Sequence, residues 1–122
     1  MNILVTGCNG QLGNEMQLLE KDNGQHVFFN TDVSQLDITD QAAVDRFVAD
    51  HEIDCIVNCA AYTAVDRAES DRELCTTLNT VAPAYLAAAV ERRGGAMIQV
   101  STDYVFDGKA HTPYVETDTP SP

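Results

Sequence analysis

Basic side chains are scarce in this sequence. It contains 7 Lys and Arg residues against 19 Asp and Glu residues, which gives a formal net charge of −12 at pH 7. Nucleic acids and anionic membrane surfaces attract clustered positive charge, so the composition argues against both as partners. The same shortage means that a bound phosphate group would have to be held mainly by backbone N–H groups.

Long hydrophobic runs and a secretory leader pattern are also missing. No stretch approaches the roughly 18 apolar residues of a membrane-spanning helix, and Met1-Asn2-Ile3 is not a basic region followed by an apolar run. We therefore expect a cytoplasmic protein. With 122 residues, of which 44% are hydrophobic, the chain is predicted to form one domain with a packed core.

The few cysteines and histidines do not form a metal-binding pattern. Cys8, Cys55, Cys59 and Cys75 show neither a CxxC pair nor zinc spacing, and the three histidines are scattered. We expect free thiols, no metal site and no hydrolytic triad. Cys8 lies in a glycine-rich turn before a predicted helix, where its thiol pKa could be lowered, but a buried free thiol is the favoured interpretation.

Apolar runs and helix-period segments alternate along the sequence. The pattern predicts strands over residues 2–6, 26–31, 54–60 and 96–101, helices over 11–21 and 41–51, and a long helix opened by a capping box at 70–73 and bent at Pro83. Such alternation is typical of a doubly wound α/β domain with a parallel sheet, for which we predict the strand order 3-2-1-4. The segment after the last strand is polar and proline-rich, and Tyr104 at its start is expected to pack in the core.

Three glycines follow the first predicted strand at a spacing that suits a dinucleotide. Gly7 permits a tight turn, Gly10 lets the backbone approach a pyrophosphate, and Gly13 lets the next helix pack closely on the strand. The start of that helix then offers unpaired N–H groups and the positive end of its dipole to the anion. The alternative is an ordinary turn between a strand and a helix.

Asp32 is predicted to contact the ribose of the coenzyme. It lies 19 residues beyond Gly13, at the end of the second predicted strand, where a carboxylate can accept hydrogen bonds from the adenosine ribose hydroxyls. Thr31, Val33 and Ser34 beside it offer no positive charge for a 2′-phosphate, so NAD is favoured over NADP. The alternative is a solvated loop aspartate, as is common in so acidic a sequence.

Two further segments follow predicted strands and are expected at the same edge of the sheet. Ala60 and Ala61 would let a coenzyme lie against the backbone, although close packing of a helix on the sheet is the alternative. Thr102 could donate from its hydroxyl to an alkoxide that forms at a substrate carbonyl. Asp103 either accepts from a sugar hydroxyl or caps the turn, and Asn79 is expected to bond a neighbouring strand end.

Together these motifs resemble the extended short-chain dehydrogenase/reductases, and most closely the dTDP-4-dehydrorhamnose reductases among them. The resemblance rests on Gly10-Gln11-Leu12-Gly13, Leu36-Asp37-Ile38-Thr39-Asp40, Val57-Asn58-Cys59-Ala60-Ala61-Tyr62-Thr63-Ala64-Val65-Asp66 and Ser101-Thr102-Asp103-Tyr104-Val105-Phe106. The glycine motif is common to the superfamily, whereas the last two runs are far more specific. The resemblance covers essentially the whole chain and implies a Rossmann-like fold.

The resemblance implies that NADH or NADPH reduces the 4-keto group of dTDP-4-dehydro-L-rhamnose, which gives dTDP-L-rhamnose. It implies coenzyme contacts at Gly10, Gln11, Leu12, Asp32, Asp37, Ile38, Ala61, Tyr62 and Thr63. Thr102 and Asp103 are implied to contact the dTDP-sugar, with Thr102 as the hydroxyl of the catalytic set. A homodimer of the full-length enzyme is a further expectation.

The family's Tyr-x-x-x-Lys motif, which carries the proton donor and the lysine that tunes it, is not found in this sequence. Lys21 and Lys109 are its two lysines, and neither follows a tyrosine by four positions. We therefore expect residues 1–122 to be an incomplete dinucleotide-binding domain, without the substrate domain and without turnover of its own. A sugar-nucleotide epimerase or dehydratase of the same superfamily, or a non-catalytic nucleotide-binding regulatory subunit, is the alternative function.

Overall fold

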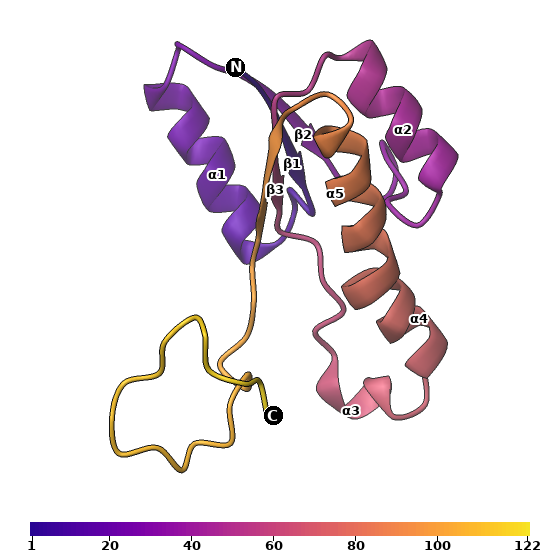
Figure 1. Cartoon of the computed structure of the whole chain (residues 1–122). Helices are drawn as coiled ribbons and strands as arrows, with labels where there is room; N and C mark the ends of the chain where they lie inside the picture. Colours follow the sequence, from indigo (N-terminus) through magenta and orange to yellow (C-terminus); the bar gives the residue numbers. More distant parts are fainter.

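A four-stranded parallel β-sheet with helices on both faces forms the body of the protein (Figure 1). The computed structural model describes all residues from Met1 to Pro122. In chain order the elements are β1 Asn2–Thr6, α1 Gln11–Asp22, β2 Val27–Thr31, α2 Gln41–Asp50, β3 Cys55–Asn58, α3 Val65–Ala68, α4 Arg72–Thr76, the π-helical turn η1 Thr77–Val81, α5 Ala82–Glu91 and β4 Ala96–Gln99. Helix α1 covers one face of the sheet, while α2 and α5 pack side by side on the other. None of the helices combines the length and the hydropathy needed to cross a lipid bilayer.

The strands lie in the order β2-β1-β3-β4, and all neighbours are parallel. This confirms the doubly wound α/β class but shows that the predicted order 3-2-1-4 is wrong. The reason is burial: three of the four β3 residues are buried, and such a strand needs a neighbour on each side, whereas the predicted order leaves it at the sheet edge. β2 accepts the edge position instead, because it carries the polar Asn30 and the 55% exposed Val27.

The larger part of the hydrophobic core lies between the sheet and the α2–α5 layer. Leu4 of β1 and Ile56 of β3 are fully buried there against Val48 of α2 and Leu86 of α5. Because successive strand side chains point to opposite faces, their neighbours form a smaller cluster under α1. That cluster consists of Ile3, Val5 and Val57, with Met16, Phe28, Cys55 and Cys59 packed against it.

The long predicted helix is interrupted in its middle by the π-helical turn η1. Pro83 has no N–H group, so a regular helix would leave the carbonyl of Asn79 unpaired, and the wider turn falls at this point. The predicted capping box does not form. The Ser70 hydroxyl donates to the Arg67 carbonyl instead, and Asp71 at the N-cap position accepts no capping hydrogen bond.

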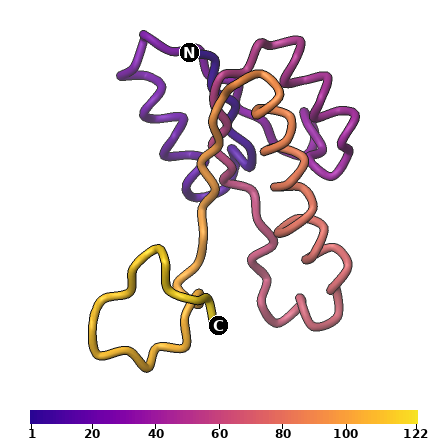
Figure 2. Tube along the Cα trace, viewed as in Figure 1, coloured from indigo at the N-terminus to yellow at the C-terminus, as the bar shows by residue number.

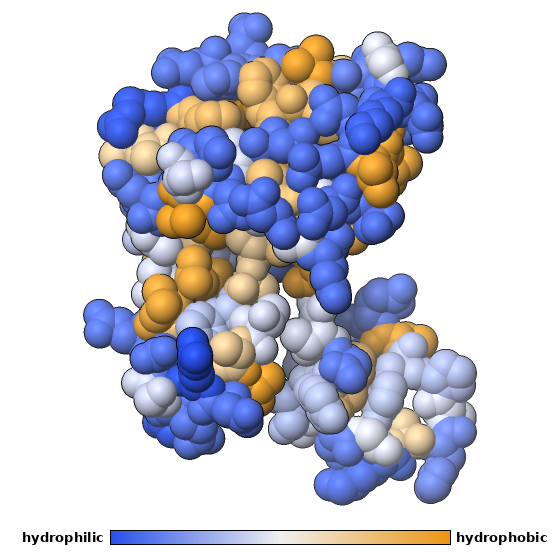
Figure 3. All heavy atoms as spheres, turned by 180° about the vertical axis from the view of Figure 1, so that it is seen from behind, coloured by the Kyte–Doolittle hydropathy of each residue, from blue (hydrophilic) through white to orange (hydrophobic).

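Residues 100–122 leave the sheet as a separate loop that contains neither helix nor strand (Figure 2). Residues 105–121 of this loop close on themselves, because the Ser121 N–H donates to the Val105 carbonyl at 2.9 Å. Seen from behind, the loop and the α3–α4 end of the molecule form two separate projections (Figure 3). The prediction for Tyr104 is wrong: its side chain is 79% exposed, because the segment after β4 turns away from the core.

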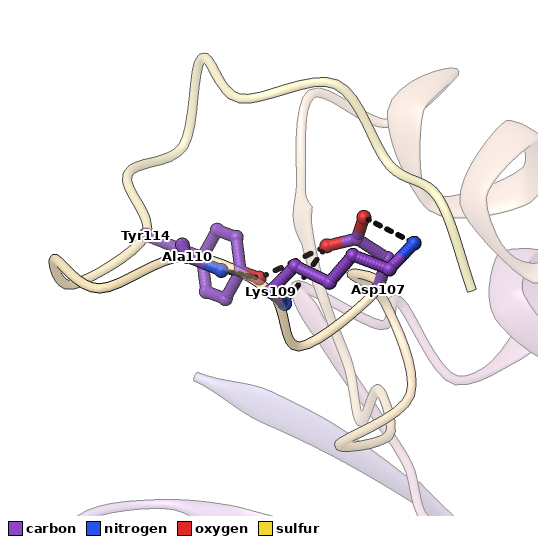
Figure 4. A network of polar contacts seen from close by, with 4 residues as sticks. All are labelled: Asp107, Lys109, Ala110 and Tyr114. Carbon is purple, nitrogen blue, oxygen red and sulfur yellow. Dashed lines mark hydrogen bonds and ion pairs between the residues drawn. The ribbon is translucent and has the colours of Figure 1, made fainter.

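A small polar network holds the inside of this loop together (Figure 4). The Tyr114 hydroxyl donates to the Asp107 carboxylate, while its ring stacks on Phe106 with the centroids 4.2 Å apart. The backbone N–H of Lys109 also donates to Asp107 and is the largest cause that keeps the pKa of this carboxyl below its ordinary value. The loop is therefore ordered by its own side chains rather than by the sheet.

Replacing Leu86 by alanine is predicted to lower the free energy of unfolding by about 2–5 kcal/mol, because the change opens a cavity between α5 and the sheet. Urea denaturation followed by circular dichroism measures this loss. Leu18→Ala is the matched control on α1, since that side chain is 51% exposed, and it should change the free energy by less than about 0.5 kcal/mol. Equal losses for the two variants would contradict the assigned core.

Candidate functional site

A pocket of about 490 Å³ opens where β1, β2 and β3 end. Its lining consists of Thr6, Gly7, Gly10, Asp32, Val33, Leu36, Asp37, Ile38, Thr39, Cys59, Ala60, Ala61, Leu74 and Leu78. The structure thus brings together Gly7, Gly10, Asp32, Asp37, Ile38, Ala60 and Ala61 from the predicted set. No Lys or Arg lies in this lining, and no group of three or more His, Cys, Asp or Glu side chains in the molecule is arranged to hold a metal ion.

The three glycines of the first turn differ in what surrounds them. Gly7 has φ +62°, and a Cβ there would lie 2.8 Å from the backbone of Ala60, so only glycine fits between β1 and β3. A Cβ on Gly13 would lie 2.3 Å from the Gly7 carbonyl oxygen, which explains how α1 packs so close to the turn. A Cβ on Gly10 would meet only that same oxygen, at 3.3 Å, so this position is less crowded than the other two. The surroundings of Gly7 and Gly13 agree with the tight turn and the close helix packing predicted for them.

The start of α1 offers backbone donors that have no acceptor within the protein. Neither the backbone nor any side chain accepts a hydrogen bond from the N–H groups of Gln11, Leu12 and Gly13, and Gly10 at the N-cap position supplies no capping side chain. The helix dipole adds positive potential at the same place. Gln11, Leu12 and Gly13 do not line the pocket, but Gly10, which immediately precedes them, does. This arrangement suits an anion.

Asp32 closes the pocket beside the glycine turn. One oxygen of its carboxylate accepts from the Asn9 N–H at 3.2 Å, and the other accepts from the Val33 N–H at 2.8 Å. The nearby Cys8 thiol is buried, and burial followed by the negative charge of Asp32 raises its pKa. The possible lowering of this pKa by the helix is therefore outweighed, and Cys8 is a buried free thiol as favoured.

Asp37 and Ile38 form the side of the pocket that lies beyond β2. The Asp37 carboxylate accepts from the Thr39 hydroxyl at 2.7 Å and from the Thr39 N–H at 2.9 Å. These two bonds, with the hydroxyl as the larger cause, keep the pKa of Asp37 below its ordinary value. Asp37 is exposed, whereas Ile38 is buried and joins the core, so the pair presents a charge at the rim above an apolar base.

Asn79 ties the loop that follows β3 to the turn η1, as predicted. Its amide oxygen accepts from the Tyr62 N–H at 2.8 Å, and its amide nitrogen donates to the Tyr62 carbonyl at 3.1 Å. The Tyr62 hydroxyl also donates to Asp71, at 2.9 Å. Tyr62 and Thr63 do not line the pocket. Tyr62 acts in this structure as an anchor for the wall formed by Ala60 and Ala61.

The apolar wall and the polar base of the pocket were not predicted from the sequence. Leu74 and Leu78 form the wall, and their spacing of four residues, typical of one helix face, was the signal that could have identified them. Asn58, which is 1% exposed, accepts from the Thr6 hydroxyl and donates to the Gln99 side chain at 2.8 Å. These bonds join the ends of β1, β3 and β4 beneath the pocket.

Thr102 and Asp103 are not brought into the pocket. Both are exposed in the loop that follows β4 and are absent from the lining. The register of the sheet nevertheless relates them to it, because Gln99 of β4 lies opposite Asn58 of β3. Thr102 comes three residues beyond Gln99, and Ala61 comes three residues beyond Asn58, so both chains leave the same edge of the sheet.

The family model described as RmlD substrate binding domain matches residues 1–122. The chain belongs to this family. Over 122 residues it is 47% identical to the dTDP-4-dehydrorhamnose reductase of Burkholderia thailandensis. The aligned region covers 100% of this chain and 40% of that relative. The chain thus spans about 40% of the length of the curated relatives that it matches.

Solved structures of dTDP-4-dehydrorhamnose reductases share the fold. The dTDP-4-dehydrorhamnose reductase of Clostridium acetobutylicum matches with a TM-score of 0.92 at 44% identity, over 100% of this chain and 43% of that chain. The dTDP-4-dehydrorhamnose reductase of Bacillus anthracis, solved in complex with NADP, matches with a TM-score of 0.90 at 36% identity, over 99% of this chain and 43% of that chain. The Rossmann-like fold expected for the sequence is therefore confirmed.

The two glycines around the start of α1 should respond differently to alanine. Gly13→Ala is predicted to lower the free energy of unfolding by about 2–3 kcal/mol, because the new Cβ meets backbone atoms that cannot move away. Gly10→Ala should cost less, about 1 kcal/mol, since its Cβ would crowd a single backbone oxygen, at 3.3 Å, and the N-cap preference for glycine is lost. Chemical denaturation of both variants measures the difference, and similar losses would refute the assigned packing.

Removing the Thr39 hydroxyl is predicted to raise the pKa of Asp37 toward its ordinary value. Because the folded-state pKa is lowered, the stabilisation that Asp37 supplies is present above the unfolded pKa of about 3.9 and is lost as the pH falls through the folded pKa. Thr39→Val should reduce the loss of stability that accompanies acidification, because the Asp37 pKa is less lowered. Thr39→Ser keeps both donors, so the loss should remain as in the unaltered protein. Carboxyl carbon NMR titration measures the shift, and an unchanged pKa in Thr39→Val would contradict the assignment.

Proposed function

We propose that this protein is the coenzyme-binding part of a longer NAD(P)H-dependent reductase that converts dTDP-4-dehydro-L-rhamnose into dTDP-L-rhamnose. One observation carries the proposal: the N–H groups of Gln11, Leu12 and Gly13 have no acceptor and lie beside a pocket without any basic side chain. A pyrophosphate needs such donors. The names of the reductase relatives, and the NADP bound to one of them, support the choice of substrate and coenzyme.

The residues present fit a dinucleotide on three counts. Gly10 has no side chain, so a phosphate would approach the backbone there, and the N–H groups at the start of α1 would hold it. Asp32 would accept from the ribose hydroxyls. Asp37 and Ile38, facing the apolar wall of Leu74 and Leu78, would enclose the adenine end. When bound, the reduced nicotinamide supplies a hydride.

On the substrate side, we assign the first role to Thr102. Its hydroxyl would donate a hydrogen bond to the oxygen of the 4-keto group, where negative charge develops during reduction. The position of Thr102 at the edge of the sheet from which Ala61 also leaves supports this role. Asp103 would accept from a sugar hydroxyl. No Tyr-x-x-x-Lys motif is present in residues 1–122, so these residues by themselves should show no turnover.

The carboxylate of Asp32 also bears on the choice between coenzymes. It lies at the pocket rim and no Lys or Arg lines the pocket, so a 2′-phosphate bound there would meet a like charge without compensation. The proposed coenzyme of this chain is therefore NADH rather than NADPH. NADH keeps a free 2′-hydroxyl that can donate to the carboxylate.

Calorimetric titration of the protein with NADH and with NADPH tests this function. We expect NADH to bind more tightly, and Asp32→Asn to reduce the discrimination against NADPH by about fivefold, because the like charge is removed. Asp50→Asn is the matched control, since Asp50 ends α2 outside the pocket and its change alters only the net charge. Absence of binding of either coenzyme would overturn the proposal, as would turnover of the ketosugar by residues 1–122 at an ordinary enzymatic rate.

A further inference from the structure

Two polar side chains of α1 reach back to the glycine turn from which their own helix starts. The Gln17 side-chain amide donates to the Cys8 carbonyl at 2.6 Å. A trans peptide unit is planar, and its carbonyl and N–H point in opposite directions. The N–H of the same unit belongs to Asn9 and donates to Asp32 at 3.2 Å. This peptide unit is therefore held at both of its ends.

The next peptide unit is held in the same way. The Asn14 side-chain amide donates to the Asn9 carbonyl at 3.3 Å, while the N–H of that unit, on Gly10, donates to the Gly7 carbonyl at 3.0 Å. Asn14 and Gln17 are three residues apart and so lie on one face of α1. Consecutive carbonyls of the turn are thus both directed toward this face of the helix.

The orientation of these peptide units matters because nothing else in the pocket supplies positive charge. Its lining holds Asp32 and Asp37 but no basic residue, so an anion would be attracted by peptide dipoles alone. If the unit between Cys8 and Asn9 turned over, its carbonyl oxygen would point toward Asp32 on the pocket side of the turn and would add negative potential where the anion would bind. Glycine makes such turning easy, and this turn contains Gly7 and Gly10.

We propose that Gln17, assisted by Asn14, is a positioning residue that sets the phosphate affinity of the site by fixing the carbonyls of the turn away from the ligand. This inference rests on the proposed function, because it presumes a phosphorylated nucleotide in the pocket. Neither side chain needs to touch the ligand. The effect should therefore depend on whether the ligand carries phosphates, which distinguishes it from a general loss of stability.

Titration of the protein with ADP-ribose and with adenosine, followed by amide NMR shifts, tests the inference. In Gln17→Met, which keeps the length of the side chain but removes its donor, the Kd for ADP-ribose should rise about fivefold to tenfold. The Kd for adenosine, which has no phosphate, should change by less than about twofold. Asn14→Leu should weaken the binding of ADP-ribose with the same selectivity but by a smaller factor, because the hydrogen bond of Asn14 is longer. This variant replaces Gln17→Met if Gln17→Met does not fold.

The matched control is Gln25→Met, which makes the same chemical change at an exposed position between α1 and β2. It should leave both Kd values unchanged. Three results would overturn the role of Gln17 and leave the proposed function standing. In Gln17→Met these are an equal rise of the Kd for both ligands and an unchanged Kd for ADP-ribose. The third is an equal effect of Gln25→Met on the Kd for ADP-ribose. Failure of the unaltered protein to bind ADP-ribose would overturn the proposed function, and this inference with it.

Discussion

The close contact between the start of α1 and the end of β1 is the constraint on which the rest of the site depends. Gly13 lies so near the Gly7 carbonyl that no side chain can come between them, and Gly7 in turn lies against the backbone of Ala60. Because these contacts join β1, α1 and β3, they determine where the helix begins relative to the sheet. The pocket exists because three strand ends and one helix start are held within this short range.

The site shows how an acidic protein can offer an attractive place to an anion. Two carboxylates, of Asp32 and Asp37, lie at the pocket, yet each is already engaged by N–H groups that neutralise part of its field. The donors at the start of α1 remain free. In the proposed coenzyme site, side-chain charge would limit which phosphates are accepted, whereas the backbone would supply the attraction.

Local features of this structure could be predicted from the sequence, and features that depend on distant partners could not. The glycine turn and the ends of β1 and α1 follow from short-range patterns, and they were predicted. The strand order was wrong because it depends on which strands need two neighbours, a property of the assembled sheet. The capping box is absent because the Ser70 hydroxyl bonds the Arg67 carbonyl of the preceding turn, and the helix begins only at Arg72. Leu74 lies in α4, which continues through η1 into α5. Because α5 packs on the sheet, Leu74 is placed at the pocket.

The hydrogen bond between Ser121 and Val105 allows the length of the segment between them to vary. A chain excursion that returns to its point of departure can gain or lose residues while both of its ends stay in place, and the entropic cost of greater length grows only slowly. Related proteins can therefore differ in the size and composition of this excursion while the strands beneath it keep their positions. The surface formed by this loop can therefore vary in evolution without a change to the pocket at the ends of β1, β2 and β3.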